Sequence, residues 1–430
     1  MFSFGNRKVS MESYKGVRDF YPEAQAVQNY IFGVMRKAVE SFGFVEYSAS
    51  ILEPAELYKA KSSDEIVREQ TYTFTDRGGR EVTLRPEMTP TVARMIATKW
   101  QETPFPARWY TIPNLFRYEK PQRGRLREHW QLNADIFGVA SEYADAEIIA
   151  LASRVMQSFG AKNADFEIRV NSREFLADLF QSIGVKTEKT QELYRALDKK
   201  DKISAEEFKK ALDKVVGEET TKKILEMFYY GEAALTMLAE SFAGQRLNKV
   251  IDILRKLGVD NIKFAPTLTR GFDYYTGIVF EVFDTNQENP RSLFGGGRYD
   301  KLTEVFVAES VPAVGFGMGD VTIKDFLETH KLLPEIKSTT DLWLAVAPET
   351  DIALVYLLAQ KLREAGVRVG IDISNKKLPD QLKTLEKRGV LFVMVVGSTE
   401  LTAQKFVLRN VKTREEKEVG LTEIATMVKQ

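Results

Sequence analysis

The chain has 430 residues, of which 44% are hydrophobic and 11% aromatic, so it is long enough and apolar enough to form two or three domains with their own cores. Its 61 basic and 61 acidic side chains balance, which excludes a global electrostatic field and leaves only local patches for binding nucleic acid. The absence of cysteine excludes disulfides, thiolate zinc sites and cysteine nucleophiles, and the presence of only two histidines excludes a histidine-rich metal site.

The N-terminal part of the chain predicts an alternation of helical and extended structure. Apolar residues recur at helical spacing over residues 25–42, and an extended segment, GFVEYSASILEP, follows. Alternating apolar residues over residues 71–85 predict a hairpin that leads into a helix over residues 90–99. At the corner between them, Glu87 and Thr89 fit either a site for an ammonium group or a helix-capping arrangement, and the residues alone do not decide between these.

A basic stretch, FRYEKPQRGRLREHWQLNAD, follows a strand predicted over residues 109–116. It reads as strand, loop and strand, and the interval from Arg108 to Arg127 carries six basic side chains and one acidic one, Glu119. The loop contains a proline and a glycine, so it can approach a ligand closely. One interpretation is a solvated basic hairpin. The other is a polyanion site formed by one arginine on a strand and three on a mobile arm: Arg117, Arg123, Arg125 and Arg127.

The middle of the chain predicts a helical insertion between two β-rich parts. A helix over residues 144–159 and a strand over residues 166–170 precede it. Residues 171–258 are nearly all helical in pattern, and their dense charge is typical of a solvated surface.

The β pattern returns over residues 259–328 and carries two polar motifs and a glycine-rich strand. The first motif, RGFDYYTG, places four polar or charged residues between strand-like runs: Arg270, Asp273, Tyr274 and Tyr275. The second, GGGRYD, is a triple-glycine turn that opens onto Arg298 and Tyr299, an arrangement that gives a ligand backbone room. Residues 311–327 then predict a strand with side chains small enough for a flat ligand to lie on the sheet, followed by a helix.

Residues 329–340 form a polar linker, after which strands and helices alternate. This pattern predicts a separate α/β domain over residues 341–430.

The polar residues of these motifs suit two kinds of ligand. The arginines at strand or turn positions, together with the basic loop, suit one polyphosphate. The acids Glu87, Asp135 and Asp273, with Gln131 and the tyrosines, suit a small molecule that carries an ammonium group and hydrogen-bonding side groups. No P-loop and no dinucleotide-binding glycine motif is present, so a nucleotide would be held by a sheet with arginines.

These motifs together resemble those of the histidyl-tRNA synthetases, a family of class II aminoacyl-tRNA synthetases. FRYEKPQRGRLREHWQ resembles motif 2 of that class, GFVEYSASILEP resembles motif 1, and AVGFGMGDVTI occupies the place of motif 3. RGFDYYTG and GGGRYD resemble the two histidine-specific motifs of the family. The resemblance covers essentially the whole chain, and RGFDYYTG with the motif 2 loop is its most specific part.

The resemblance implies an α+β fold with a six-stranded antiparallel catalytic sheet and flanking helices. The catalytic domain would comprise residues 1–170 and 259–328, interrupted by a helical insertion over 171–258 that contacts tRNA. After the linker at 329–340, residues 341–430 would form an α/β anticodon-binding domain.

The resemblance also implies the reaction and the partners. A homodimer formed through motif 1 would activate L-histidine with ATP and Mg²⁺ to histidyl-adenylate, and would transfer histidine to the 3′ end of tRNA(His). The carboxylate of histidine is the attacking group, so no protein nucleophile is needed, in agreement with the composition. Because the chain has no apolar run long enough to span a membrane and no signal-peptide pattern, we expect a cytoplasmic protein without a membrane partner.

Residue roles follow from the matched motifs. Arg117 and Arg270 would be the catalytic cations at the α-phosphate, Arg270 on the side of the incoming carboxylate. Glu119 would contact the adenine amino group, and the outer phosphates would meet Arg125, with Arg298 as a further ATP contact. Besides Arg270, the histidine pocket would contain groups that bind the ammonium or the imidazole or close over the ligand: Glu87, Thr89, Gln131, Asp135, Tyr274, Tyr275 and Tyr299.

Three positions depart from the family pattern. Thr322 stands where motif 3 normally provides an arginine for the γ-phosphate, and we expect Arg125 or Arg298 to compensate. Ser50 replaces the proline usual in motif 1. Asp135 stands where the imidazole-binding acid is usually the longer glutamate.

Two other interpretations have different consequences. A synthetase-like regulatory subunit of ATP phosphoribosyltransferase would be non-catalytic, but such subunits usually lack both the C-terminal domain and an intact RGFDYYTG motif. A tRNA-sensing module that has lost catalysis is supported only by Thr322, and it would need none of the retained polar residues Arg117, Glu119, Gln131 and Arg270.

Overall fold

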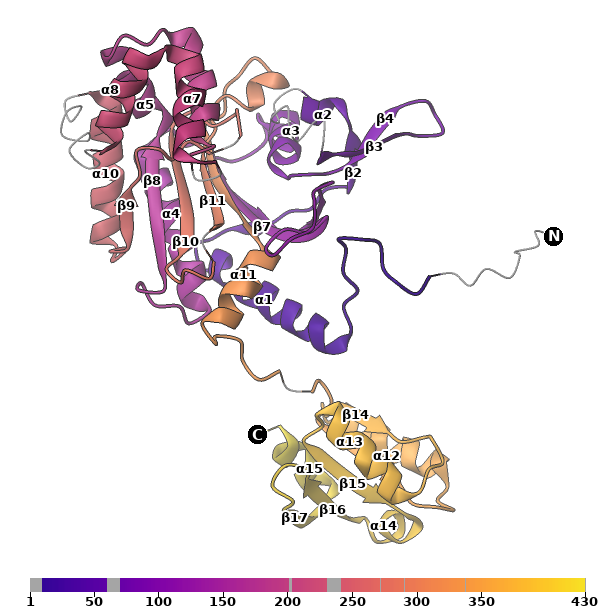
Figure 1. Ribbon diagram of the computed structural model, residues 1–430. Helices are drawn as coiled ribbons and strands as arrows, with labels where there is room; N and C mark the ends of the chain where they lie inside the picture. The colour runs from indigo at the N-terminus through magenta and orange to yellow at the C-terminus, as the bar shows by residue number, and fades with distance from the viewer. Residues whose placement is uncertain are drawn as a thin grey trace. The chain divides into compact units, whose positions relative to one another are not determined.

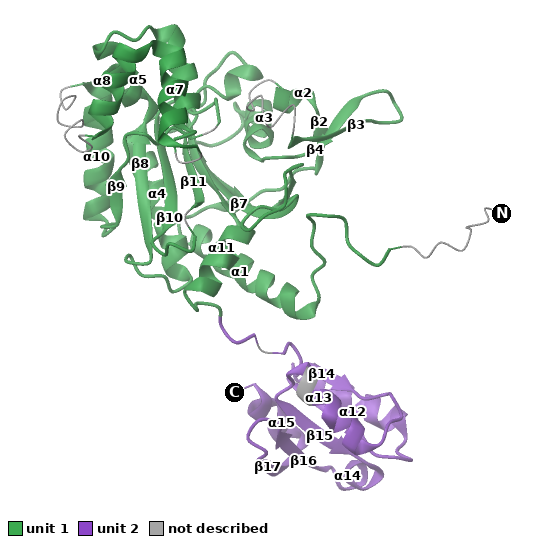
Figure 2. Cartoon of the chain, in the orientation of Figure 1, with its two compact units in different colours: residues 1–333 green, residues 334–430 purple. Residues whose placement is uncertain are grey.

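The chain divides into two compact units, residues Met1–Leu333 and Pro334–Gln430, and the division falls within the predicted linker (Figure 2). The computed structural model describes residues 10–59, 70–200, 203–229, 241–270, 272–289, 291–336 and 338–429. Among the helices of these residues, none is both long and apolar enough to cross a membrane.

The first unit is built around one large sheet, whose strands within the described residues run in the order β1-β5-β7-β12-β11-β10-β8-β9, with β6 paired to β7 (Figure 1). The middle six strands pair antiparallel, as the predicted fold requires. Their bounds are Ala107–Thr111 (β5), Glu128–Phe137 (β7), Ala313–Gly319 (β12), Ser292–Arg298 (β11), Ile278–Asp284 (β10) and Phe166–Ser172 (β8). Short parallel strands extend both ends: β1, Val45–Glu46, beside β5, and β9, Ile262–Phe264, beside β8.

The two faces of this sheet differ because neighbouring residues of a strand point to opposite sides. On β7, Leu132, Ala134 and Ile136 are buried in the main hydrophobic core. Helices cover that face and contribute to the same core: α1 (Pro22–Glu40), α4 (Glu142–Ser158), α10 (Phe242–Lys256) and α11 (Asp320–Thr329). The intervening residues of β7 therefore face the other side, where the polar side chains collect.

The polar side of the sheet is bordered by α3, Thr89–Lys99, and by a small sheet in the order β2-β4-β3. The hairpin predicted over residues 71–85 is confirmed as β3 (Tyr72–Thr75) and β4 (Glu81–Leu84), paired antiparallel, while β2 spans Leu52–Pro54. The helix predicted to follow is confirmed as α3.

The single strand predicted over residues 109–116 is wrong. β5 ends at Thr111 and a separate strand, β6 (Asn114–Phe116), begins after Pro113. Proline has no backbone N–H to donate to a ladder, so the chain bends there before it rejoins β7.

The helical insertion predicted from residue 171 begins where β8 ends. Its described helices are α5 (Arg173–Ser182), α6 (Thr190–Leu197), α7 (Ala205–Val216), α8 (Glu218–Tyr229) and α10, with a 3₁₀ turn, η2 (Thr187–Lys189). Leu176, Leu193 and Leu212 are fully buried in a core of the insertion's own. Figure 1 shows α5, α7 and α8 grouped past one end of β8.

The second unit is an α/β domain around a sheet in the order β14-β13-β15-β16-β17. The strands are β13 (Leu342–Val346), β14 (Val369–Ile371), β15 (Phe392–Val396), β16 (Lys405–Asn410) and β17 (Glu416–Gly420), and the helices are α12 (Ile352–Glu364), α13 (Leu378–Arg388), α14 (Ser398–Ala403) and α15 (Leu421–Val428). The strand–helix alternation predicted for this part is confirmed. Two hydrophobic clusters, one around Leu344 and Phe406 and one around Ala345 and Leu385, show that both faces of the sheet are covered.

Candidate active site

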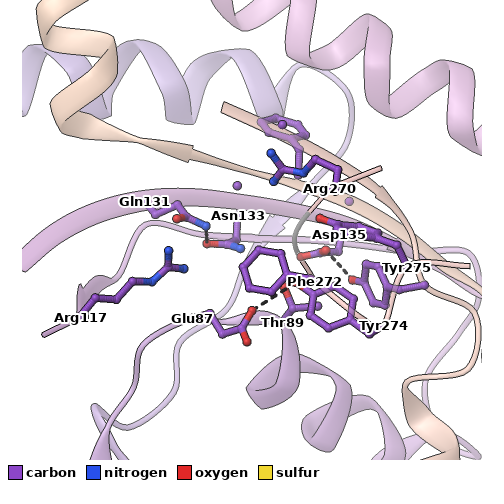
Figure 3. A pocket seen from close by; sticks show the side chains of 15 residues that line it. Glu87, Thr89, Arg117, Gln131, Asn133, Asp135, Arg270, Phe272, Tyr274 and Tyr275 are labelled. Carbon is purple, nitrogen blue, oxygen red and sulfur yellow. Dashed lines mark hydrogen bonds between the residues drawn. The ribbon is translucent and has the colours of Figure 1, made fainter. Parts of the chain in front are cut away.

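One cavity on the polar side of the large sheet brings together most of the residues singled out in the sequence. Nine of the twelve candidate site residues line it, from segments that are far apart in the chain (Figure 3). They are Glu87, Thr89, Arg117, Gln131, Asp135, Arg270, Tyr274, Tyr275 and Tyr299.

The floor of the cavity is formed by β7 and β12. Gln131 and Asp135 are four residues apart on β7, so both point to the same side of the sheet. Their side chains lie across two glycines of β12: a Cβ on Gly315 would be 1.9 Å from Asp135 Oδ1, and a Cβ on Gly317 would be 2.0 Å from Gln131 Nε2. The glycines are therefore needed for close approach, and they allow these polar side chains to lie flat on the sheet.

Asp135 is a buried carboxylate with one oxygen held and one open. The Tyr299 hydroxyl donates to its Oδ1 at 2.5 Å, while its Oδ2 is buried and has no partner within the described residues. Burial raises the pKa of the Asp135 carboxyl to about 7, although the hydrogen bond from Tyr299 acts in the opposite direction. An acceptor without a partner at the base of a polar cavity suits a ligand N–H group.

The raised pKa of Asp135 predicts that, without ligand, the free energy of unfolding falls as the pH rises. The folded-state pKa of about 7 lies above the ordinary value of 3.8, so between these values the folded state keeps a proton that the unfolded chain has released. Replacing Asp135 with asparagine should therefore raise the free energy of unfolding at pH 8 by on the order of 4 kcal/mol and have little effect near pH 4. Denaturant unfolding without ligand at several pH values measures this difference.

The exposed residue Asp252 of α10 provides the control, because Asp252→Asn removes a carboxylate that is not buried. A stability difference for Asp135→Asn that did not change with pH would contradict the raised pKa.

Arg117 enters the cavity immediately after β6. Its backbone N–H donates to Arg127 O, and its Nε donates to Pro86 O at 2.9 Å. The first bond fixes the backbone and the second holds the guanidinium. Since Arg117 has no carboxylate partner among the residues that the structure describes, its positive charge is available to an anion.

Arg270 is held in an unusual conformation opposite a carboxylate. Its φ is 61°, in the left-handed region that side chains other than glycine rarely adopt. Its Nη1 lies 2.5 Å from Glu281 Oε1, whereas its Nε is buried and has no partner in the described part of the chain. The backbone of Arg270 directs its side chain, and the Nε–H group has no partner within the described residues. Such a cation suits a site where negative charge develops during a reaction.

Glu87 and Thr89 belong to the cavity wall and not to a helix cap. The residue that caps α3 is Met88, no side chain caps the helix, and Thr89 is the first helical residue. Glu87 accepts a hydrogen bond from the Tyr274 hydroxyl at 3.2 Å. The centroid of the Tyr274 ring lies 4.9 Å from the centroid of the Tyr275 ring and 5.8 Å from that of the Tyr299 ring. The capping interpretation is therefore wrong, and a ligand-binding role remains for this pair.

The expectation that Arg298 contacts ATP is wrong. Its side chain is 0% exposed on the helix-covered side of the sheet, because it neighbours Tyr299, which faces the cavity. Its Nε donates to Asp145 Oδ1 at 2.8 Å and its Nη1 donates to Asp300 Oδ1 at 3.0 Å. Two further bonds, to Val139 O and Ser141 O, complete a buried structural network.

Replacing Arg298 with methionine should lower the free energy of unfolding by about 3 kcal/mol, because it leaves the buried carboxylate of Asp145 without its nearest cation. The Arg298→Met protein that folds should have the same KM for ATP as the wild type. Denaturant unfolding and steady-state kinetics measure the two quantities. The half-exposed Arg169 of β8 provides the control, and Arg169→Met should change stability by less than about 1 kcal/mol. A raised KM with unchanged stability would restore an ATP-binding role for Arg298.

Glu119 and Arg125 lie in the motif 2 loop and do not line the cavity. Arg125 Nη1 is 3.6 Å from Glu119 Oε2, and the Arg125 side chain is 53% exposed. The loop closes over Thr322: a Cβ on Gly124 would be 3.5 Å from the Thr322 methyl group, while the Thr322 hydroxyl donates to Leu293 O at 2.7 Å. Thr322 thus packs against the loop. Arg125 and Arg298 were expected to replace the arginine that is absent from motif 3, and of these two only Arg125 is accessible.

The structure also adds residues that the sequence reasoning missed. Asn133 lines the cavity between Gln131 and Asp135 and accepts a hydrogen bond from Gln131 Nε2 at 3.1 Å. Strand periodicity along β7 was a sufficient signal for it. Glu281 pairs with Arg270 across eleven residues, and no local pattern marks that contact.

Comparison with known proteins reveals similarity over nearly the whole chain. The family model for histidyl-tRNA synthetase matches residues 16–321, and the model for the anticodon binding domain matches residues 346–430. The histidine–tRNA ligase of Leptospira biflexa serovar Patoc is 38% identical over 433 residues, covering 99% of this chain and 98% of the relative. That of Thermoplasma volcanium is 36% identical, covering 98% of this chain and 99% of the relative.

Among solved structures, that of a histidyl-tRNA synthetase from Nostoc sp. PCC 7120 superimposes with a TM-score of 0.81 at 24% identity, covering 98% of this chain and 99% of the other. At this identity the match supports the fold.

Proposed function

The chain belongs to the histidyl-tRNA synthetase family, and from this premise we propose that it activates L-histidine with ATP and transfers histidine to the 3′ end of tRNA(His). The observation that carries the proposal is the open oxygen of Asp135 at the base of a cavity that also contains two arginines. Arg270 is paired with Glu281, and Arg117 has no carboxylate partner among the described residues. A pocket of this kind fits a molecule with a ring N–H at one end and an anionic group at the other.

The histidine would lie on the floor formed by β7 and β12. Its ring N–H would donate to Asp135, with Tyr275 at the other ring nitrogen and Tyr274 and Tyr299 closing over the ring. Its ammonium group would bind to three polar side chains of the cavity lining: Glu87, Thr89 and Gln131. Asp135 is shorter than the family's usual glutamate, and the absence of Cβ atoms at Gly315 and Gly317 lets the ligand lie close to it.

The chemistry would be driven by charge stabilisation. A carboxylate oxygen of histidine attacks the α-phosphorus of ATP, a new P–O bond forms, and the bond to the departing pyrophosphate breaks. Arg117 would bind the α-phosphate from the side of β6, and Arg270 would bind it together with the incoming carboxylate. Because negative charge accumulates on the phosphate oxygens in the transition state, two fixed guanidinium groups lower the barrier without any proton transfer by the protein.

The remainder of ATP would be bound outside the cavity. The adenine amino group would meet Glu119, and the outer phosphates would meet Arg125 on the motif 2 loop. The described residues include no group of three or more histidine, aspartate or glutamate side chains that could hold a metal ion. Mg²⁺ would accordingly be bound mainly through phosphate oxygens and water, and would neutralise the leaving pyrophosphate.

We propose the remaining partners from the family. The insertion and the C-terminal unit would contact tRNA(His), and motif 1 would form a homodimer. The cytoplasm is the proposed location, because aminoacylated tRNA is consumed there.

The experiment that tests the proposal is amino-acid-dependent exchange of pyrophosphate into ATP, with each of the twenty amino acids. Exchange with histidine alone, followed by charging of tRNA(His), is the expected result. Folded protein that exchanges with no amino acid would overturn the proposal and favour a regulatory role instead.

A further inference from the structure

The loop that carries Arg270 has no regular structure of its own, and yet it must keep a strained residue in place. Residues 265–277 connect β9 to β10, and the described residues of the loop form no helix and no strand. The left-handed φ of Arg270 is unfavourable for a side chain with a Cβ, so the backbone around it must be held from outside.

Arg173, the first residue of α5, holds this loop through backbone carbonyl groups. Its side chain lies outside the cavity and the residue is 4% exposed. Its Nε donates at 3.0 Å to Thr269 O, and its two terminal nitrogens donate at 2.8 to 3.4 Å to four more carbonyl oxygens, those of Arg270, Phe272, Asp273 and Tyr275. A guanidinium has five N–H donors, and all of them are used on this loop.

The helical insertion supports both ends of this network. The Tyr194 hydroxyl of α6 donates to Arg173 O at 2.6 Å, and the Thr269 hydroxyl donates to Tyr194 O at 3.0 Å. Gln191 and Arg195, also on α6, bind the two carboxylate oxygens of Asp273 at 2.6 and 2.7 Å. The loop is thus attached to α5 and α6 and not to the catalytic sheet alone.

We propose that Arg173 is a positioning residue for activation: it holds the backbone on both sides of Arg270, at residues 269–270 and 272–275, so that the guanidinium of Arg270 is aimed at the reacting phosphate. This inference rests on the proposed function of the cavity. Arg173 itself touches neither histidine nor ATP, so its contribution is made entirely through Arg270.

The test is histidine-dependent pyrophosphate exchange by the full chain with Arg173→Lys. Lysine keeps the charge but has only three donors, which cannot reproduce the planar pattern of five bonds. We expect kcat to fall by about 10²-fold, since a displacement of the catalytic group by about 1 Å has an effect of this size, with KM for ATP changed by less than about threefold. The matched control Arg169→Lys, on the preceding strand, should leave both parameters unchanged.

A double-mutant cycle with Arg270→Ala separates positioning from general structural damage. If Arg173 acts through Arg270, Arg173→Lys should lower the residual kcat of Arg270→Ala by less than about threefold. The same 10²-fold loss in both backgrounds, or no loss in the wild-type background, would overturn the proposal.

Thr269→Val provides a second probe if Arg173→Lys does not fold. It removes the hydroxyl bond to Tyr194 O, which still accepts from Asp198 N. A loss of kcat that disappears in the Arg270→Ala background is again expected. Failure of both variants to fold would assign the network to folding and overturn the proposal. Wild-type protein without histidine-dependent exchange would instead overturn the proposed function, so the two failures are distinguishable.

Discussion

Replacing Arg270 with alanine is expected to lower kcat for histidine-dependent pyrophosphate exchange by about 10³-fold, the loss typical of removing one fixed donor from a developing negative charge. The Arg270 side chain is 16% exposed, and it is aimed by its left-handed backbone and by Glu281. Water that enters the space left by the side chain cannot replace it, because water must reorient as the charge develops.

Exchange rates and thermal unfolding should be measured on the same preparations. Arg270→Lys retains the positive charge, and its kcat should be about tenfold above that of Arg270→Ala but below that of the wild type, since an ammonium group cannot make the same two-point contact. The control is Arg169→Ala, which removes a half-exposed arginine that does not line the cavity. A loss of less than about tenfold with unchanged stability would exclude Arg270 from stabilising the transition state.

Replacing Asp135 with alanine is expected to reduce kcat/KM for histidine by about 10³-fold, because a site built to accept a ring N–H leaves that group unpaired when the acceptor is lost. Oδ2 is the buried oxygen that a ligand would meet, and Tyr299 holds the other oxygen at 2.5 Å. The effect should appear mainly in KM for histidine, while KM for ATP changes little.

The kcat/KM of Asp135→Asn for histidine should lie between the values of the wild type and of Asp135→Ala, because the amide oxygen still accepts a hydrogen bond but carries no negative charge. Since the same substitution is expected to stabilise the empty protein at pH 8, a variant that is more stable and less active would show that the buried carboxylate is retained for binding and not for folding. Equal loss of affinity for histidine and for an analogue without ring nitrogens would contradict the assignment.

The two interpretations that compete with an active enzyme make opposite predictions for these variants. A regulatory subunit or a sensing module would show no exchange activity to lose. The intact Arg117 and Arg270 sites and the similarity that extends through the anticodon binding domain model favour the enzyme.

The order of the elements and most of the cavity residues could be predicted from the amino-acid sequence alone. Local patterns act over a few residues, so the hairpin at β3 and β4, the helix α3 and the glycine-rich strand β12 could be predicted from them. Period-two alternation places Gln131 and Asp135 on one face of β7, and applied consistently it would also have found Asn133. The turn predicted at GGGRYD is wrong, because the three glycines and Arg298 belong to strand β11, whose alternation directs Arg298 away from the cavity. The resemblance to a known family then joined the motifs that are distant in the chain.

The contacts that hold the site together became evident only in the folded chain. Arg173 lies about a hundred residues before the carbonyl groups that it binds. Glu281, on strand β10, pairs with Arg270 of the loop that precedes this strand. Carbonyl acceptors are present at every residue, so no residue type marks those that a distant arginine will bind. The pKa of Asp135 is likewise decided by burial, and burial depends on which segments cover a residue after folding.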